Sequence, residues 1–217
     1  MPTSRYERAA RAAGFRSIAG VDEAGRGALF GPVFAAAVIL DPSRQIRGLE
    51  DSKQLEPERR AALAGRIRER AVAWAVAGAD AYEIDRVNIL EASRMAMKRA
   101  VERLRTPSDY LLIDAIHVQL PVRQKAVIHG DALSFSIAAA SILAKVARDE
   151  ALVKWDQVFP RYGFARNKGY GTSEHLDALD QFGPTALHRY SFEPVRKASR
   201  GYVWTGYPEQ GELFACL

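Results

Sequence analysis

Cysteine is almost absent from the chain: Cys216 is the only one in 217 residues. One cysteine cannot close an internal disulfide or build a cysteine-ligated zinc site. Long apolar runs are also missing, because the longest, residues 33–40, is far shorter than the roughly 20 residues that span a bilayer. The first sixteen residues contain four arginines and no apolar stretch of secretory length, so we expect no signal peptide. These absences favour a soluble protein of the reducing cytoplasm.

The overall composition is that of an ordinary globular protein. Hydrophobic residues make up 48% of the chain, enough for a full core, and the 26 glycines and prolines together are too few for a fibrous or low-complexity chain. We find no internal repeat and no long linker. The net charge of +5 suits an anionic partner such as nucleic acid, although a charge of this size also serves solubility alone.

Apolar runs predict a set of short strands. Residues 17–21 and 33–40 read as two strands separated by the glycine-rich turn 25–27, and residues 71–77 as a third whose alanines also suit a helix. Residues 110–113 form a compact apolar run that indicates a buried strand. Val127 and Ile128 either begin a further short strand or lead into the glycine that follows.

Helical patterns fill most of the remaining chain. They cover residues 56–70, 84–104, 131–149 and 173–182, the last with Ser173 as its expected cap. The last twenty or so residues read as irregular. Strands first, then alternating strands and helices, predict an α/β protein with a central mixed sheet flanked by helices.

Four carboxylates stand at predicted element boundaries. Asp22 and Glu23 end the first strand, Asp114 ends the buried strand, and Asp131 opens the alanine-rich helix. Rigid strands aim the side chains at their ends into a common crevice, which makes such positions typical of active sites. Alternatives remain open: a solvated turn for Asp22 and Glu23, an ion pair for Asp114, and an ordinary helix cap for Asp131.

Clustered carboxylates repel one another unless a cation neutralises them, and oxygen ligands select hard ions such as Mg²⁺ or Mn²⁺. Asp22 and Glu23 face opposite sides of a regular strand, but Gly25 and Gly27 allow the backbone to bend sharply after them. Two such ions would support in-line phosphoryl transfer without a serine nucleophile. No local motif supports a Ser-His-Asp triad.

Specific motifs follow one another between about residues 16 and 195. They are GVDEAGRG at 20–27, GPV at 31–33, DSK at 51–53, EIDRVNIL at 83–90, GD at 130–131, SIAAASILAK at 136–145, GYGT at 169–172 and HRYSF at 188–192. In these motifs and their order the chain resembles the type 2 ribonuclease H family, bacterial ribonuclease HII. Phe30 and Phe34 depart from the resemblance, since smaller residues are expected there, and we expect both to repack the core.

The resemblance implies an RNase H-like fold with a small C-terminal helical portion, a catalytic domain over residues 1–195 and a tail of unknown structure over 196–217. It implies cleavage of RNA in RNA–DNA hybrids and incision 5′ of ribonucleotides embedded in DNA, leaving a 3′-hydroxyl and a 5′-phosphate. Asp22, Glu23, Asp114 and Asp131 match the family's acidic positions, the first three being its usual metal ligands. A non-catalytic hybrid-binding module and an unselective two-metal nuclease are the alternatives.

The resemblance also implies a nucleic-acid interface. Gly25, Arg26 and Gly27 match the loop whose backbone contacts the ribonucleotide 2′-hydroxyl, and Tyr170 matches the tyrosine that stacks on the sugar beside the scissile junction. We place Lys53, Asn88 and Lys145 near the nucleic acid, with plain surface polarity or capping as the alternative. Arg166 and Lys168, which precede Tyr170, are expected to contact phosphates. A monomer is expected, with a terminal segment as a possible tether to the replication clamp.

Overall fold

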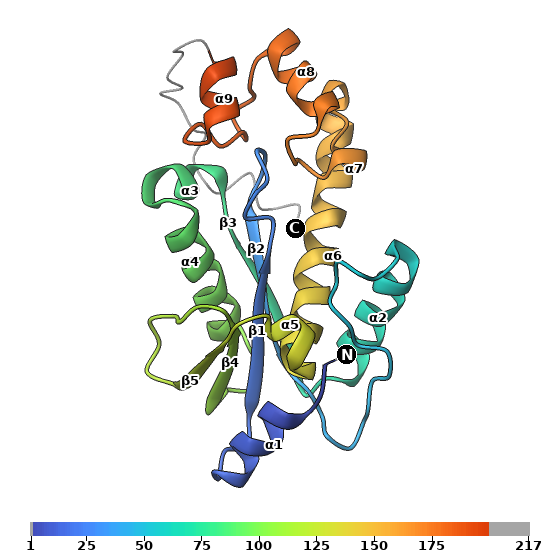
Figure 1. Ribbon diagram of the computed structural model, residues 1–217, viewed down its shortest axis with the longest axis vertical. Helices are drawn as coiled ribbons and strands as arrows, with labels where there is room; N and C mark the ends of the chain where they lie inside the picture. Colours follow the sequence, from blue (N-terminus) through green and yellow to red (C-terminus); the bar gives the residue numbers. More distant parts are fainter. Residues whose placement is uncertain (1, 200–217) are drawn as a thin grey trace.

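The computed structural model describes residues 2–199, and its centre is one five-stranded mixed sheet (Figure 1). The strand order is β3-β2-β1-β4-β5. β1 pairs antiparallel with β2, which pairs antiparallel with β3, whereas β1 and β4, and β4 and β5, are parallel. The strands are β1 (Ile18–Ala24), β2 (Val33–Ile39), β3 (Ala73–Ala79), β4 (Tyr110–Asp114) and β5 (Arg123–Val127). The four strands predicted from apolar runs are present. Val127 does not begin a further strand: it is the last residue of β5, whose residues 123–126 were not predicted as a strand.

Strand β2 shows how the sheet divides the core, because all seven of its residues are buried. Its odd-numbered residues pack with α4 (Ile89–Glu102), and Ala36 and Val38 pack with α2 (Pro57–Arg70) and α6 (Phe135–Val158). Helices therefore cover both faces of the sheet, with α4 on one side and α2 and α6 on the other (Figure 1). The predicted mixed sheet flanked by helices is confirmed.

Helix α6 lies directly against the middle of β1 because Gly20 has no side chain. A Cβ on Gly20 would stand 2.0 Å from the carbonyl carbon of Ser136, inside any allowed contact. The alanine-rich sequence of α6 supports both its helicity and this close approach. The strand that carries Asp22 and Glu23 is thus fixed against the longest helix among residues 2–199.

Two predicted helices have different boundaries in the structure. The single helix expected over residues 84–104 is broken at Asn88, whose φ of 73° ends α3 (Ala81–Val87) and whose side chain caps α4. The helix expected to begin at Asp131 begins at Phe135, after the short α5 (Gly130–Leu133), and it runs to Val158 rather than residue 149. Ser134 is its N-cap, so Asp131 is not the cap of the long helix.

The C-terminal part of the described chain is helical. It contains η1 (Pro160–Tyr162), α7 (Phe164–Asn167), α8 (Ser173–Phe182) and α9 (Glu193–Ala198), which gather at the end of the molecule opposite α1 (Arg5–Ala12) (Figure 1). Thr172, not Ser173, caps α8. Phe30 is fully buried against this region, stacked on Phe164 with ring centroids 3.8 Å apart. Phe34 is also buried.

Most of the predicted tail, residues 196–217, lies outside the residues that the structure describes. Residues 196–198 complete α9, while residues 200–217, including Cys216, lie outside the described residues. Within residues 2–199, no helix combines the length and apolar character needed to span a membrane.

Candidate active site

Strand β1 carries the first two acidic residues, and it continues past both of them. Asp22 lies opposite Ala36 of β2 and Glu23 opposite Ala35, and the strand ends at Ala24, one residue after Glu23. Asp22 is 4% exposed, and its Oδ1 accepts the amide of Glu23 at 2.8 Å. Because side chains alternate along a strand, Asp22 faces α6 and Glu23 the other side.

Asp114 reaches the same edge of the sheet from β4. Val21 of β1 pairs with Ile113 of β4 in parallel register, and both belong to the core beneath α4. The next residue of each strand, Asp22 or Asp114, therefore projects from the opposite face, toward α5 and α6. The amide of Gly130 donates to Oδ1 of Asp114 at 2.7 Å, which ties β4 to the start of α5.

Asp131 closes the group from α5. It is 6% exposed, its Oδ1 accepts the amide of Ala132 at 2.9 Å, and its Oδ2 lies 3.7 Å from the ammonium of Lys53. Burial alone would lower the pKa of Lys53, but four nearby carboxylates, among them Asp131, Asp22 and Asp114, raise it. The structure thus brings the sequence-predicted Lys53 to the same cluster.

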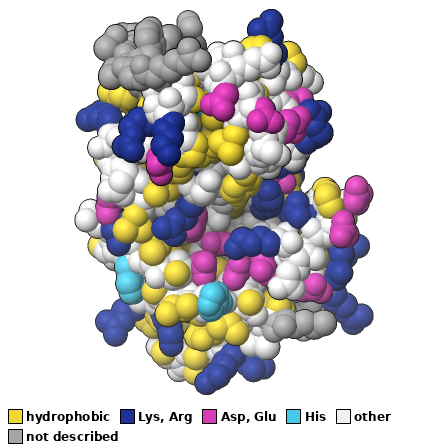
Figure 2. Space-filling model, turned by 45° about the horizontal axis from the view of Figure 1, so that its top comes forward, with side chains coloured by type: hydrophobic (Ala, Val, Ile, Leu, Met, Phe, Trp, Pro, Cys, Tyr) yellow, Lys and Arg dark blue, Asp and Glu magenta, His cyan; other side chains and the backbone are white. Residues whose placement is uncertain are grey.

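Burial and mutual repulsion make the negative charge of this cluster costly. The pKa of Asp22 is raised well above its ordinary value by burial, then by Glu23 and Asp114. Burial also raises the pKa of Glu23, although the charge of Arg26 opposes this effect. Burial raises the pKa of Asp114 as well, and the charge of Asp131 raises it further. Figure 2 shows acidic side chains gathered in the middle of one face, with Lys and Arg side chains beside them.

A hard divalent cation fits this chemistry, because oxygen donors whose charges repel one another are stabilised by a dication. Across residues 2–199, no group of three or more His, Cys, Asp or Glu side chains is arranged so that it could hold a metal ion by itself. Mg²⁺ commonly keeps several waters and takes further ligands from substrate phosphates. The cluster suits an ion that is only partly held by the protein.

The loop after β1 is held by a buried arginine that the sequence did not reveal. Gly25 has a φ of +95°, and a Cβ there would stand 2.4 Å from Nε of Arg148. Arg148 of α6 is fully buried and donates to the carbonyls of Phe30 and Pro32 at 3.2 and 2.6 Å, and to that of Lys168 at 2.9 Å. Its guanidinium therefore joins the loop to the segment before Tyr170.

A second buried arginine holds the same loop from the C-terminal side. Arg189 is fully buried and donates from Nε to the carbonyl of Gly31 and from a terminal nitrogen to that of Arg26, both at 2.9 Å. The Arg26 side chain is 3.3 Å from Glu23, so it braces the loop by an ion pair. Arginine is seldom buried, and nothing local in the sequence distinguishes Arg148 or Arg189 from surface residues.

Tyr170 lies beside residues 25–27, which we call the glycine loop. The Gly169 carbonyl accepts the amide of Leu29 at 2.7 Å, and a Cβ on Gly27 would stand 4.0 Å from Cε1 of Tyr170. The tyrosine is 36% exposed, and the Arg148 guanidinium carbon is 5.9 Å from its ring centroid. The structure therefore brings together Gly27 and Tyr170, 143 positions apart in the sequence.

The other predicted nucleic-acid residues have partners within the protein. Lys145 pairs with Asp149 at 2.7 Å, and Asn88 accepts the amides of Leu90 and Glu91 as a helix cap. Arg166 pairs with Glu174, and Lys168 donates to the carbonyl of Ala165 at 2.6 Å. Their contact with nucleic acid stays a prediction.

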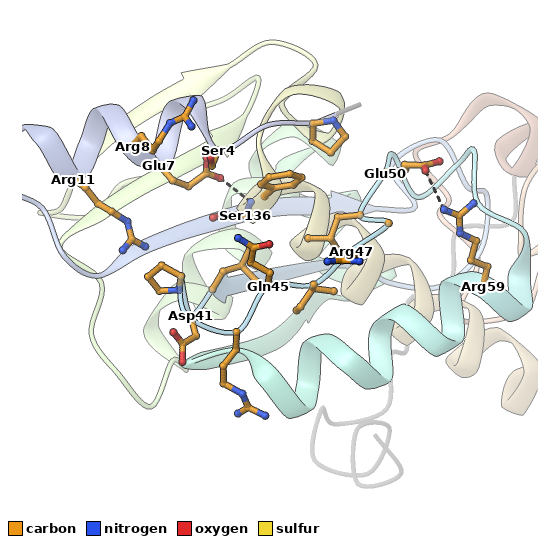
Figure 3. Close-up of a pocket in the computed structure, with 18 residues that line it drawn as sticks. Ser4, Glu7, Arg8, Arg11, Asp41, Gln45, Arg47, Glu50, Arg59 and Ser136 are labelled. Atoms are coloured by element: carbon orange, nitrogen blue, oxygen red, sulfur yellow. Dashed lines mark hydrogen bonds and ion pairs between the residues drawn. The ribbon is translucent and has the colours of Figure 1, made fainter.

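A separate cavity of about 610 Å³ lies between α1, residues 40–50 and the start of α6 (Figure 3). Glu7 reaches across from α1, and its Oε1 accepts the amide of Ser136 at 2.8 Å. Arg59 pairs with Glu50 at the other end at 3.1 Å. None of the four sequence-predicted carboxylates lines this cavity, so cavity size alone does not locate the acidic cluster.

Comparisons with known proteins match most of the chain. The family model described as Ribonuclease HII matches residues 19–195. A ribonuclease HII of Solibacter usitatus is 64% identical over 194 residues, 89% of this chain and 85% of the relative.

Two solved structures have a similar fold. The ribonuclease H2 of Pyrococcus horikoshii superposes with a TM-score of 0.72 at 26% identity, covering 85% of this chain and 98% of that one. The RNase HII in a PCNA:RNase HII complex from Archaeoglobus fulgidus gives 0.71 at 24% identity, covering 82% and 96%.

Proposed function

The chain belongs to the ribonuclease HII family and is a ribonuclease H of type 2, and from this premise we propose how it selects and cuts its substrate. It cleaves the RNA of RNA–DNA hybrids and incises duplex DNA 5′ of an embedded ribonucleotide. The cut leaves a 3′-hydroxyl and a 5′-phosphate. Hydrolysis depends on two divalent ions, Mg²⁺ or Mn²⁺.

One observation carries the proposal. Four carboxylates from β1, β4 and α5 lie close enough at the edge of the sheet to repel one another, and burial raises the pKa of three of them. Asp22, Glu23 and Asp114 would hold the ions, and Asp131 is the fourth catalytic carboxylate. When bound, two such ions supply a nucleophilic water and stabilise the leaving oxygen. Lys53 would contact the phosphate chain beside Asp131.

Selectivity for a ribonucleotide is assigned to the glycine loop and to Tyr170. The 2′-hydroxyl both donates and accepts a hydrogen bond, so a protein can read it with backbone groups. Gly27 is exposed, and within the described chain its amide has no hydrogen-bond acceptor, so it is available to the substrate. Tyr170, next to it, would stack on the neighbouring sugar.

The remaining polar residues would guide the nucleic acid to this edge. Asn88, Lys145, Arg166 and Lys168 already make contacts within the protein, and their role would be to offer side chains to phosphates as well. The protein would act as a monomer in the cytoplasm. A terminal segment would tether the protein to a replication clamp, since the Archaeoglobus fulgidus neighbour is described as a PCNA:RNase HII complex.

The test compares three duplexes of one sequence: all DNA, DNA with one ribonucleotide, and an RNA–DNA hybrid. We expect cleavage of the second and third with Mg²⁺ or Mn²⁺ and none with chelator. Asp114→Asn should lower the rate by at least about a hundredfold, because it removes a ligand charge. Asp177→Asn, at an exposed position of α8, is the matched control and should cut normally.

Each alternative has its own outcome in this assay. Equal cutting of the all-DNA duplex would indicate an unselective nuclease and refute the assignment of the glycine loop and Tyr170. Tight binding without cleavage under every metal condition would indicate a binding module and refute the catalytic assignment.

A further inference from the structure

Two buried histidines stand in direct contact behind Tyr170. His175 lies in α8 and His188 in the segment that follows this helix, and both are fully buried. Their Nε2 atoms are 3.0 Å apart. A hydrogen bond between two such nitrogens requires one to donate and the other to accept, so the two rings cannot both carry a proton at Nε2.

The partners at the two ends settle which nitrogen carries each proton. The carbonyl of Tyr170 lies 3.0 Å from Nδ1 of His175 and can only accept, so Nδ1 of His175 is protonated and its Nε2 is an acceptor. The amide of Thr185 lies 2.9 Å from Nδ1 of His188 and can only donate, so His188 is protonated at Nε2. Both ends thus require the same arrangement: two neutral rings, with His188 donating to His175.

The surroundings keep both rings neutral. The rings of Tyr162 and Phe164 pack against both histidines, with centroids 5.2 to 6.2 Å away. Burial lowers the pKa of His175 and lowers the pKa of His188 to about 3, with His175 adding to the effect on His188. The charged group that acts on His175 is Glu174, which is itself paired with Arg166.

The histidine pair connects the two structures that face the substrate. Phe30, in the segment held by Arg148, forms an antiparallel bridge with His188, and the Tyr170 carbonyl is the far end of the relay. That carbonyl also accepts the amide of Thr172 at 2.8 Å. We propose that His188 and His175 are positioning residues, a neutral relay that sets Tyr170 against the glycine loop and so helps to select the ribonucleotide. The inference rests on the sugar-stacking role proposed for Tyr170.

The test separates positioning from folding with two substitutions at one site. His175→Phe keeps a ring of similar size but removes the donor to Tyr170, whereas His175→Asn restores a donor near the position of Nδ1. We expect His175→Phe to raise KM for the duplex with one ribonucleotide about tenfold with a smaller change in kcat, and His175→Asn to recover part of that loss. His117→Asn, at an exposed histidine, is the control.

Coupling to Tyr170 gives the decisive comparison. If the relay acts through the tyrosine ring, His175→Phe should add less than about twofold when Tyr170→Ala is already present. Losses that multiply in the double variant would refute the relay. If Tyr170→Ala alone changes nothing, the stacking role falls, and the relay as a selectivity element falls with it.

Imidazole ¹⁵N spectra of the full chain test the hydrogen-bond directions independently of cleavage. The expected result is a proton on Nδ1 of His175 and on Nε2 of His188, with the His188 ring neutral at pH 6. The opposite tautomers, or a charged His188 at pH 6, would overturn the relay whatever the substrate assays show.

Discussion

Replacing Gly25 by alanine tests how the glycine loop depends on buried Arg148. The new Cβ would stand 2.4 Å from Nε, 2.6 Å from Cδ and 2.8 Å from Cζ of Arg148, so the guanidinium must move. The guanidinium donates to three backbone carbonyls and is fully buried, so a displaced guanidinium cannot replace these hydrogen bonds with bonds to water. Displacing such a charge from its partners costs about 3–5 kcal/mol of stability.

The positive φ of Gly25 adds a separate cost of about 1–2 kcal/mol for any residue with a Cβ. Gly14 isolates this cost, since its φ is +96° and nothing lies within 4 Å of its Cβ position. Gly14→Ala should therefore lose only the backbone contribution. Subtracting the two variants leaves the displacement of Arg148, about 3–5 kcal/mol, or a melting temperature about 6–20 °C lower than that of Gly14→Ala.

The assay is urea and thermal unfolding of both variants, with cleavage of the duplex containing one ribonucleotide measured well below the melting temperature. Gly25→Ala should lose cleavage even where it is folded, because the loop that meets Tyr170 is displaced. Gly14→Ala should cut at the normal rate. If the two variants were within about 1 kcal/mol of each other, Arg148 would not hold the loop as described.

Three further predictions concern the acidic cluster and the packing of β1. Asp114→Asn, expected to slow cleavage at least about a hundredfold, should also raise the melting temperature in chelator, because burial raises the pKa of Asp114 and its charge destabilises the metal-free fold. A lower melting temperature would contradict this. Because the pKa values of Asp22, Glu23 and Asp114 are raised, the folded cluster binds more protons than the unfolded chain. The stability of the metal-free protein should therefore fall as pH rises from the ordinary carboxyl pKa values through the raised ones. Mg²⁺ should stabilise the protein more at pH 8 than at pH 5, which calorimetry at both pH values checks. Gly20→Ala should unfold the protein because α6 occupies the position of the new Cβ, whereas Gly65→Ala, in open space on α2, should add about 0.5–1 kcal/mol of stability. Denaturation midpoints of the two variants measure both effects. A folded Gly20→Ala variant with α6 unmoved would refute the close packing of β1 on α6.

The sheet could be predicted because its signal is local. Strand β2 is a continuous apolar run, which is typical of a strand covered on both faces, and the compact apolar run before Asp114 placed that carboxylate at the end of β4. Element ends were less predictable. The break at Asn88 depends on a positive φ at a residue that also caps the next helix, and helical periodicity passes through it unchanged.

The supports of the loop were beyond sequence reasoning, because burial of a polar side chain is decided by distant residues. Arg148 looks like one more charged position of a long helix, and only the carbonyls of Phe30, Pro32 and Lys168 account for its burial. His188 likewise has its ring partner 13 positions away. Local patterns fix periodicity and caps, whereas they carry no information on which carbonyl a guanidinium will meet.

The division of these supports bears on how the protein can be altered. The carboxylates are held by the sheet, by α5 and by α6, whereas the glycine loop and Tyr170 are held by Arg148, Arg189 and the histidine pair. His175, His188 and Arg189 lie in α8 or in the segment after it, and Arg148 contacts Lys168 just before Tyr170. The C-terminal helical portion is therefore part of the proposed recognition surface. Substitutions of these four residues should change which duplex is cut before they change the ability to hydrolyse a phosphodiester. A C-terminal variant that lost cleavage of every duplex in equal measure, while remaining folded, would show that recognition and hydrolysis are not built on separate supports.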